Sequence, residues 1–118
     1  MTRIRILVAS AVVALAAVAV AVPLAAAHSQ ATTTVTVTAK EYKFVLSKKS
    51  APHGTVVFKV VNKGKLKHDF KIAGKKTPLL KPGGKATLKV TLKKGKYPYL
   101  CTVKFHAKFG MKGTFTVT

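Results

Sequence analysis

The segment that decides the fold is GKYPYLCTVKFHAKFGMKGTFTV, residues 95–117. Its two ends alternate apolar and polar residues, and a loop of mixed chemistry lies between them. Tyr97, Tyr99 and Cys101 share one parity, and the apolar residues after position 113 alternate with threonines. A period of two is that of half-buried β-strands. We therefore predict a strand on each side of the loop, with the Cys101 thiol directed toward the core.

The same period of two recurs upstream, and Gly- and Pro-containing turns separate the alternating stretches. Many short strands joined by such turns are typical of all-β sandwiches. The predicted strands lie near residues 32–39, 42–47, 54–62, 68–73, 85–92, 96–103 and 113–118.

Two residues of the 96–103 strand carry more specific expectations. Pro98 has no amide hydrogen for a central strand, so it should sit at an edge or at an irregular pair. Tyr97, two residues after Gly95, resembles the tyrosine corner of Greek-key sandwiches, in which the hydroxyl caps a nearby loop.

The loop between the last two strands carries three residues that bind soft metals, Cys101, His106 and Met111. A second histidine, His68, lies 33 positions before Cys101. One thiolate, two imidazoles and one thioether suit copper in both oxidation states, because the His2Cys set favours a trigonal plane and the Met a long axial contact. We interpret the four residues as a mononuclear copper site that serves electron transfer.

Each of these residues also has an ordinary structural interpretation. A lone Cys cannot form an internal disulfide, so Cys101 could instead crosslink two molecules or act as a small buried apolar residue. His68 could be a polar residue at a strand start, and Met111 could fill the core. Their occurrence together favours the metal site.

The segments around these four residues resemble the plastocyanin/azurin group of cupredoxins, over most of the chain after residue 32. The resemblance implies a Greek-key β-sandwich with one type 1 (blue) copper ion near one end, acting as an electron carrier and not as an enzyme. Many relatives have Pro-Gly where this chain has Lys104-Phe105. The segments that carry the resemblance are Val61-Asn-Lys-Gly64, His68-Asp-Phe70, Gly95–Val103 and Gly110–Val117.

The resemblance also implies roles for residues around the ligands. The backbone amide of Asp69 should bond the Cys101 sulfur and its side chain should join the two ligand loops; the alternative is a surface acid. Phe105 and Phe109 flank His106 and could form an apolar docking rim. They could equally turn inward and cover the metal.

Residues 1–27 have the features of a secretory signal peptide: two early arginines, an apolar run and small residues at its end. We therefore expect export to the periplasm, cell envelope or exterior, and one domain over residues 28–118. An uncleaved N-terminal membrane anchor is the alternative. After cleavage, His28 could chelate copper but has no partner histidine assigned to it, and His53 should be exposed in a turn.

The chain has a formal charge of +20, which becomes +18 without Arg3 and Arg5, and it contains only two acidic residues. A surface of lysine without arginine supplies an attractive field but not bidentate recognition. We expect a monomer that docks with acidic redox proteins or with an anionic membrane or envelope surface. A purely solubilising role is the alternative. The lysines are spread along strands without clustered aromatics, which argues against nucleic-acid binding.

The function predicted from these observations is an exported one-electron carrier that cycles between Cu(I) and Cu(II). A copper chaperone or storage protein is the alternative, although such sites tend to use several Met or His, and only one Met follows the signal region. A metal-free binding module is the third possibility. Multicopper enzymes need several such domains and additional His clusters, which about 91 residues do not provide.

Overall fold

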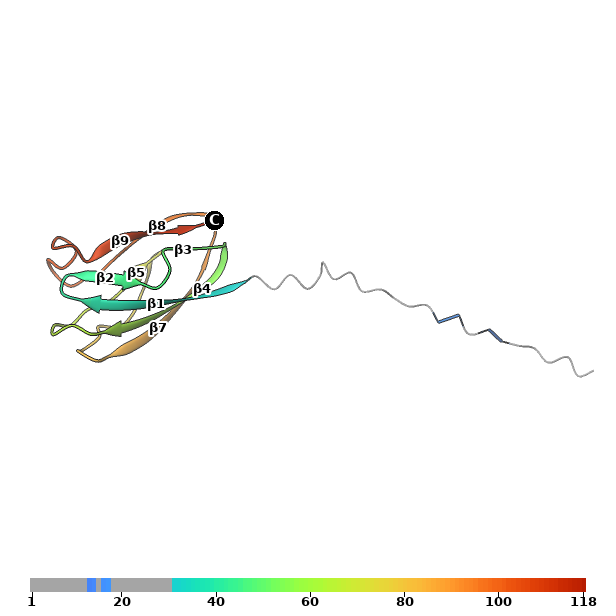
Figure 1. Ribbon diagram of the computed structural model, residues 1–118, viewed down its shortest axis with the longest axis horizontal. Helices are drawn as coiled ribbons and strands as arrows, with labels where there is room; N and C mark the ends of the chain where they lie inside the picture. Colours follow the sequence, from blue (N-terminus) through green and yellow to red (C-terminus); the bar gives the residue numbers. More distant parts are fainter. Residues whose placement is uncertain (1–12, 15, 18–30) are drawn as a thin grey trace, which may run out of the picture.

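The computed structural model describes residues 13–14, 16–17 and 31–118. Over this part of the chain the secondary structure consists of strands (Figure 1), as the predicted all-β class requires. None of the described residues forms a helix that is long and apolar enough to cross a membrane. The predicted signal peptide or anchor at 1–27 and His28 fall almost entirely outside the described residues. The strands are β1 (Thr32–Lys40), β2 (Lys43–Leu46), β3 (Ser50–Ala51), β4 (Gly54–Asn62), β5 (Lys71–Ile72), β6 (Lys75–Lys76), β7 (Lys85–Leu92), β8 (Gly95–Leu100) and β9 (Lys112–Val117).

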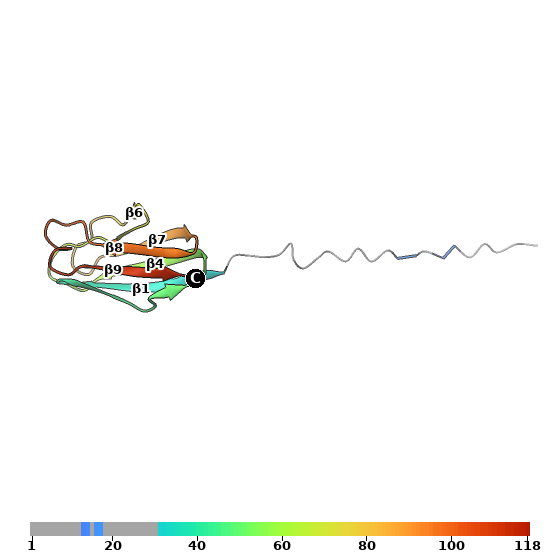
Figure 2. The ribbon, with the colours of Figure 1, turned by 90° about the horizontal axis from the view of Figure 1, so that it is seen from above.

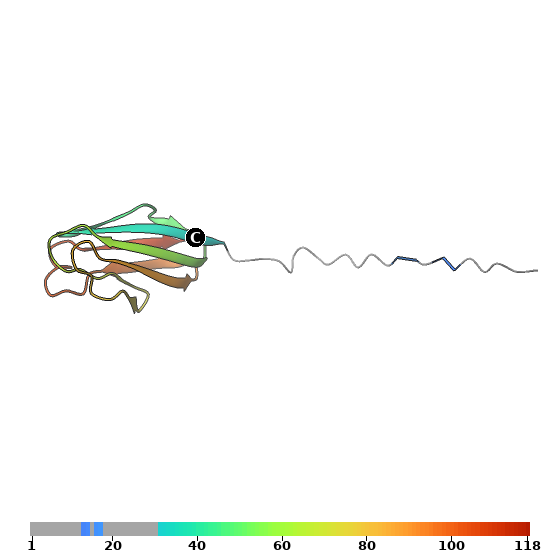
Figure 3. The same ribbon diagram turned by 90° about the horizontal axis from the view of Figure 1, so that it is seen from below.

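The strands form two mixed sheets that face each other as layers (Figure 2, Figure 3). One sheet has the order β2-β1-β4-β7, with β1 and β4 parallel and the other pairs antiparallel. The second sheet has the order β3-β9-β8-β5-β6, in which only β3 and β9 are parallel. The chain crosses between the two sheets after β2, β3, β4, β6 and β7, and the two layers form the β-sandwich predicted from the alternating pattern.

The core between the sheets is built from the inward-facing parity of each strand. Val35 and Val37 of β1 are fully buried, while the threonines between and beside them lie toward solvent. Phe58 and Phe115, from opposite sheets, meet with their ring centroids 5.3 Å apart. Phe58 also contacts Phe70 at 5.2 Å. Because aromatic side chains bury 150–250 Å² each, roughly, these rings supply much of the burial that holds the layers together.

Three of the predicted strands are shorter than expected, and the 42–47 strand is reduced to β2 at Lys43–Leu46. The 68–73 strand begins only at Lys71, because Phe70 donates its amide to the Thr77 side chain and His68 forms only an isolated bridge with Leu80. The 96–103 strand ends at Leu100, before the ligand loop. The two-residue strands β3 and β6 were not predicted as strands.

The expectations for Pro98 and Tyr97 are confirmed. Strand β5 pairs only with Tyr99 and Leu100, so no strand lies beside Pro98 on that side. The Tyr97 hydroxyl donates to the carbonyl of Lys93 at 2.7 Å, which caps the preceding turn. The Tyr97 hydrogen bond thus anchors the start of β8, which ends at Leu100, immediately before Cys101.

Candidate metal centre

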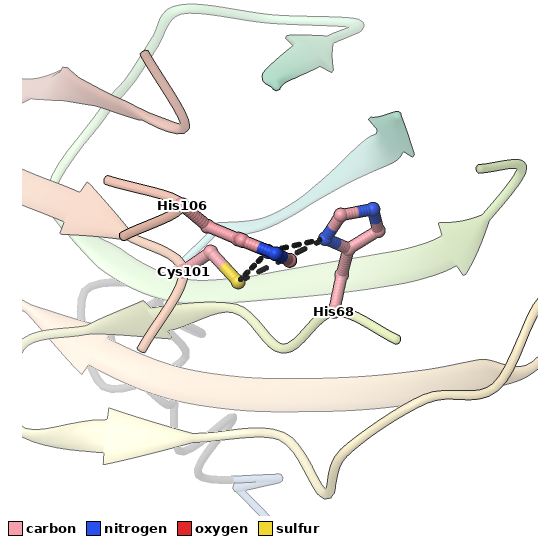
Figure 4. Close-up of side chains that lie close together, drawn as sticks. All are labelled: His68, Cys101 and His106. Atoms are coloured by element: carbon pink, nitrogen blue, oxygen red, sulfur yellow. Dashed lines mark hydrogen bonds between the residues drawn. The ribbon is translucent and has the colours of Figure 1, made fainter. Parts of the chain in front are cut away.

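The loop between β8 and β9 turns at the end of the sandwich opposite the C-terminus (Figure 1). Cys101 and His106 of this loop lie close to His68 (Figure 4). The two Nδ1 atoms are 3.1 Å apart. The Cys101 Sγ lies 3.6 Å from Nδ1 of His106 and 4.0 Å from Nδ1 of His68. All three side chains are buried and point toward one another. The structure thus brings three of the four predicted ligands together.

These distances fit three donors around one small cation. Nitrogen and sulfur ligands bind zinc, a comparable first-row metal, at about 2.0–2.3 Å. Three donors at that distance in a trigonal arrangement would be roughly 3.5–4 Å apart, close to the spacing found here. One soft thiolate and two imidazoles in a plane are the donor set of copper electron-transfer sites. The residues present thus fit copper.

Backbone hydrogen bonds hold the ligand segments in place before any metal binds. His68 exchanges two backbone hydrogen bonds with Leu80, at 3.1 and 2.8 Å. Cys101 donates its amide to the carbonyl of Met111 at 3.0 Å, and Met111 donates to His106 at 3.1 Å. Backbone hydrogen bonds between the predicted ligands therefore close the loop. Gly110 allows the chain to turn just before Met111, because its φ of 122° is readily adopted only by glycine.

Met111, the fourth predicted ligand, packs beside Cys101. It is fully buried, and it belongs to a small apolar group with Ala39 and Cys101. Phe44 and Val103 pack against this group. The thioether is therefore buried in the same apolar group as the Cys101 thiol, and its axial role remains a prediction.

Asp69 has the surroundings that the resemblance implied, and it is not a surface acid. Its side chain is buried and accepts hydrogen bonds from the backbone N–H of Thr102, at 2.6 Å, and from the Thr102 hydroxyl. The backbone amides of Asp69 and Val103 act on the Cys101 thiol as donors that lower its pKa. Asp69 thus joins the His68 segment to the Cys101 loop.

Burial and neighbouring charges set the protonation of the metal-free site. Burial raises the pKa of the Cys101 thiol, and the charge of Asp69 acts in the same direction, while the two amide hydrogen bonds oppose them. Burial also lowers the pKa of His106, and the neighbouring His68 adds to this effect. The metal-free site therefore holds a neutral thiol and a neutral His106, and metal binding must displace the thiol proton.

Glu41 is a site residue that the sequence did not reveal. Its Oε1 lies 3.0 Å from Nε2 of His68 and accepts the backbone N–H groups of Lys65 and Leu66 at 2.8 and 2.6 Å. The Leu66 hydrogen bond is the largest cause that lowers the pKa of Glu41 from 4.5 to about 2. Glu41 lies 27 positions before His68, and no local spacing links them. The one available clue was that an acid is rare in this lysine-rich chain.

An aromatic surface covers the His106 side of the cluster. Phe105 and Phe109 are exposed by 55 and 58 per cent, so they do not turn inward over the metal site. Tyr42 packs edge-on against His106 at 5.2 Å and against Phe109 at 5.1 Å between ring centroids. We call Tyr42, Phe105 and Phe109 the aromatic rim. Tyr42 was not foreseen, and His53 is exposed in its turn as predicted.

The comparisons with known proteins agree with this geometry. The family model of the cupredoxin-like domain matches residues 11–117. The chain belongs to the cupredoxin-like family. Among solved structures, this cupredoxin is similar to reduced auracyanin from the photosynthetic bacterium Roseiflexus castenholzii, with 26% identity, a TM-score of 0.64, and coverage of 73% of this chain and 97% of the auracyanin.

Two further structures share the fold at lower identity. Auracyanin A of Chloroflexus aurantiacus, described as a "blue" copper protein, is 19% identical with a TM-score of 0.63, over 75% of this chain and 100% of its own. Reduced rusticyanin is 23% identical with a TM-score of 0.63, over 74% of this chain and 79% of its own. No curated protein sequence matches. The cofactor indicated by the cupredoxin-like family is copper, and His68, Cys101 and His106 could form its site.

Proposed function

We propose that this cupredoxin is an exported one-electron carrier and not an enzyme. The observation that carries the proposal is the buried cluster of His68, Cys101 and His106, with donor atoms within 4.8 Å of one another and an exposed aromatic rim on one side. When bound, copper supplies a one-electron couple, Cu(I)/Cu(II).

The four predicted ligands have distinct roles in this proposal. Cys101 would provide the electron-rich thiolate, and His68 and His106 would provide the two imidazole nitrogens. Met111 provides a weak fourth donor from within the apolar group beside Cys101. Because both sheets and the backbone bonds of the ligand loop fix these positions, the donors can change little between the two oxidation states, which favours fast transfer.

The partner is proposed to approach over His106. His106 is 7 per cent exposed and His68 is fully buried, so His106 is the nearer of the two imidazoles to solvent. The aromatic rim lets a partner exclude water next to this ring. Lys104 and Lys108 lie in the same loop and are exposed, so an acidic redox protein complements this surface. We propose a monomer that forms short-lived complexes of this kind.

The burial of the site favours a carrier over a copper chaperone or store. A protein that passes the ion itself needs an accessible ligand that a recipient can attack, whereas His68, Cys101 and Met111 are at most 1 per cent exposed. Two surface hollows, of about 690 and 280 Å³, are lined by residues of the sheets and their turns, and neither includes a proposed ligand.

The deciding experiment is the visible spectrum and midpoint potential of the copper-loaded protein. An electron carrier should show an intense thiolate-to-Cu(II) absorption and a reversible one-electron couple. Transfer of copper to a competing copper-binding peptide within seconds, without a reversible couple, would favour the chaperone or store. Failure to bind copper would exclude both of these functions and favour a metal-free binding module. Mass analysis of the protein from its native host would test cleavage after Ala27 and export.

A further inference from the structure

The chain has two acidic residues against 22 basic ones. One of the two, Glu41, contacts His68, a proposed copper ligand. An acid selected only for solubility would not be needed on such a basic protein. The Glu41 carboxylate instead lies against Nε2 of His68, on the side of the ring away from the cluster. A carboxylate on the outer nitrogen of a metal-binding histidine fixes the tautomer and orientation of the ring.

The residues around the Glu41 carboxylate fix its position. Lys65 and Leu66 both donate backbone hydrogen bonds to the oxygen that faces His68, which holds that oxygen in place. Gly64 leaves the space for it, because a Cβ at this position would collide with the same oxygen. The φ of Gly64 is not in the left-handed region, so this position requires room for the carboxylate and not a special backbone conformation.

The hydrogen-bonding partners then determine the tautomer of His68. A carboxylate is only an acceptor, so the ring proton must be on Nε2 for the 3.0 Å contact to be a hydrogen bond. Nδ1 then carries a lone pair, which faces Nδ1 of His106 and the Cys101 sulfur. The opposite tautomer would place the proton on Nδ1, inside the metal cluster. The lone pair of Nε2 would then face the Glu41 carboxylate, which is also only an acceptor.

We propose that Glu41 is a positioning residue that fixes His68 as the Nε2–H tautomer and so prepares Nδ1 to bind the metal. Glu41 follows β1, while His68 lies in the segment between β4 and β5. The contact therefore also anchors a ligand segment, which has only an isolated bridge of its own, to the four-stranded sheet. This inference rests on the proposed copper site.

The first measurement needs no variant. Nitrogen-15 NMR of the His68 imidazole, in the metal-free and Cu(I) proteins, should show the proton on Nε2. The Glu41→Ala variant should lose this preference and bind Cu(II) about 10–100-fold more weakly in a competition titration, the usual effect of removing such a partner. Glu41→Gln keeps an oxygen acceptor, so it should keep the tautomer and lose less affinity than Glu41→Ala.

The control is Thr91→Lys, which changes the net charge by the same amount as Glu41→Gln at an exposed position near the far end of β7. Its copper affinity should stay within about 3-fold of the wild-type value. A wild-type His68 protonated on Nδ1, or an unchanged affinity in Glu41→Ala, would overturn this inference alone. Absence of copper binding by the wild-type protein would overturn the proposed function and this inference with it.

Discussion

The carboxylate of Asp69 is hydrogen-bonded to both the backbone N–H and the hydroxyl of Thr102, and this pair joins the two segments that carry the cysteine and the first histidine. Glu41 makes the corresponding connection on the other side of His68. Both acidic residues of the chain therefore lie at the proposed metal centre, while the lysines cover the rest of the surface. Their negative charges should stabilise the more positive, oxidised state of the site.

Asp69→Asn tests the effect of charge at nearly constant geometry. The amide can still accept from the Thr102 N–H, but the negative charge near the Cys101 thiolate is lost, so Cu(II) should become less stable relative to Cu(I). The midpoint potential should rise by an amount of order 60 mV, which equals about 1.4 kcal/mol for one electron. Protein-film voltammetry checks this, and an unchanged or lower potential would show that the charge does not act on the metal.

Asp69→Ala separates the hydrogen bonds from the charge. This variant leaves the Thr102 N–H without its partner in a partly buried position, so we expect a loss of about 1–3 kcal/mol in the free energy of unfolding. Asp69→Asn should lose much less. Urea denaturation of the two metal-free variants measures the difference, and equal stabilities would mean that the Asp69–Thr102 contact does not hold the loops together.

The sequence was sufficient to predict the three clustered donors, because soft ligands are scarce in this chain and three of the four lie within eleven residues. It was not sufficient for Glu41 or Tyr42, whose contacts with His68 and His106 form only when β1 and β2 pack beside the ligand loops. The alternation of apolar and polar residues likewise predicted the long strands. It could not show that the segment around His68 leaves the sheet, since that depends on the Phe70–Thr77 hydrogen bond.

Cys101→Ser should abolish the intense visible absorption of the copper-loaded protein, because that absorption arises from charge transfer between thiolate sulfur and Cu(II). The sandwich should remain folded, since the main core cluster does not include Cys101. Visible and far-ultraviolet circular dichroism spectra of the same sample check both statements. A variant that kept the wild-type colour would remove Cys101 from the ligand set.

Met111→Leu should keep the colour and raise the midpoint potential. Leucine preserves the buried apolar volume beside Cys101 but removes the weak donor, and loss of a donor disfavours Cu(II). Volume-conserving exchanges of this kind cost less than about 1.5 kcal/mol, so folding should be retained. If the potential stays the same while the protein remains folded, Met111 is a core residue and not the axial ligand.

The stability of the metal-free protein should depend on Glu41 at low pH. The folded-state pKa of about 2 lies below the ordinary value of 4.5, so the stabilisation is complete above pH 4.5 and is lost as the pH falls toward 2. Glu41→Gln does not titrate, so its melting temperature should fall less steeply between pH 5 and 2. Parallel curves for the two proteins would show that the folded-state pKa is not lowered.

The lysine surface and the aromatic rim should act on different stages of electron transfer. If the lysines serve docking, transfer to an acidic partner should slow steeply as ionic strength rises from about 0.01 to 0.15 M, where the screening length falls from roughly 30 to 8 Å. The midpoint potential should barely change over this range. Stopped-flow kinetics measure the rate, and a rate independent of salt would assign the lysines to solubility.

Phe105→Ala should slow the same reaction at every ionic strength, because Phe105 is 55 per cent exposed in the aromatic rim and governs close approach after the encounter complex has formed. The matched control is Val45→Ala, which removes a side chain exposed by 51 per cent from the outer face of the four-stranded sheet. The control should react at the wild-type rate. If both variants, or neither, slow the transfer, the partner does not dock over His106.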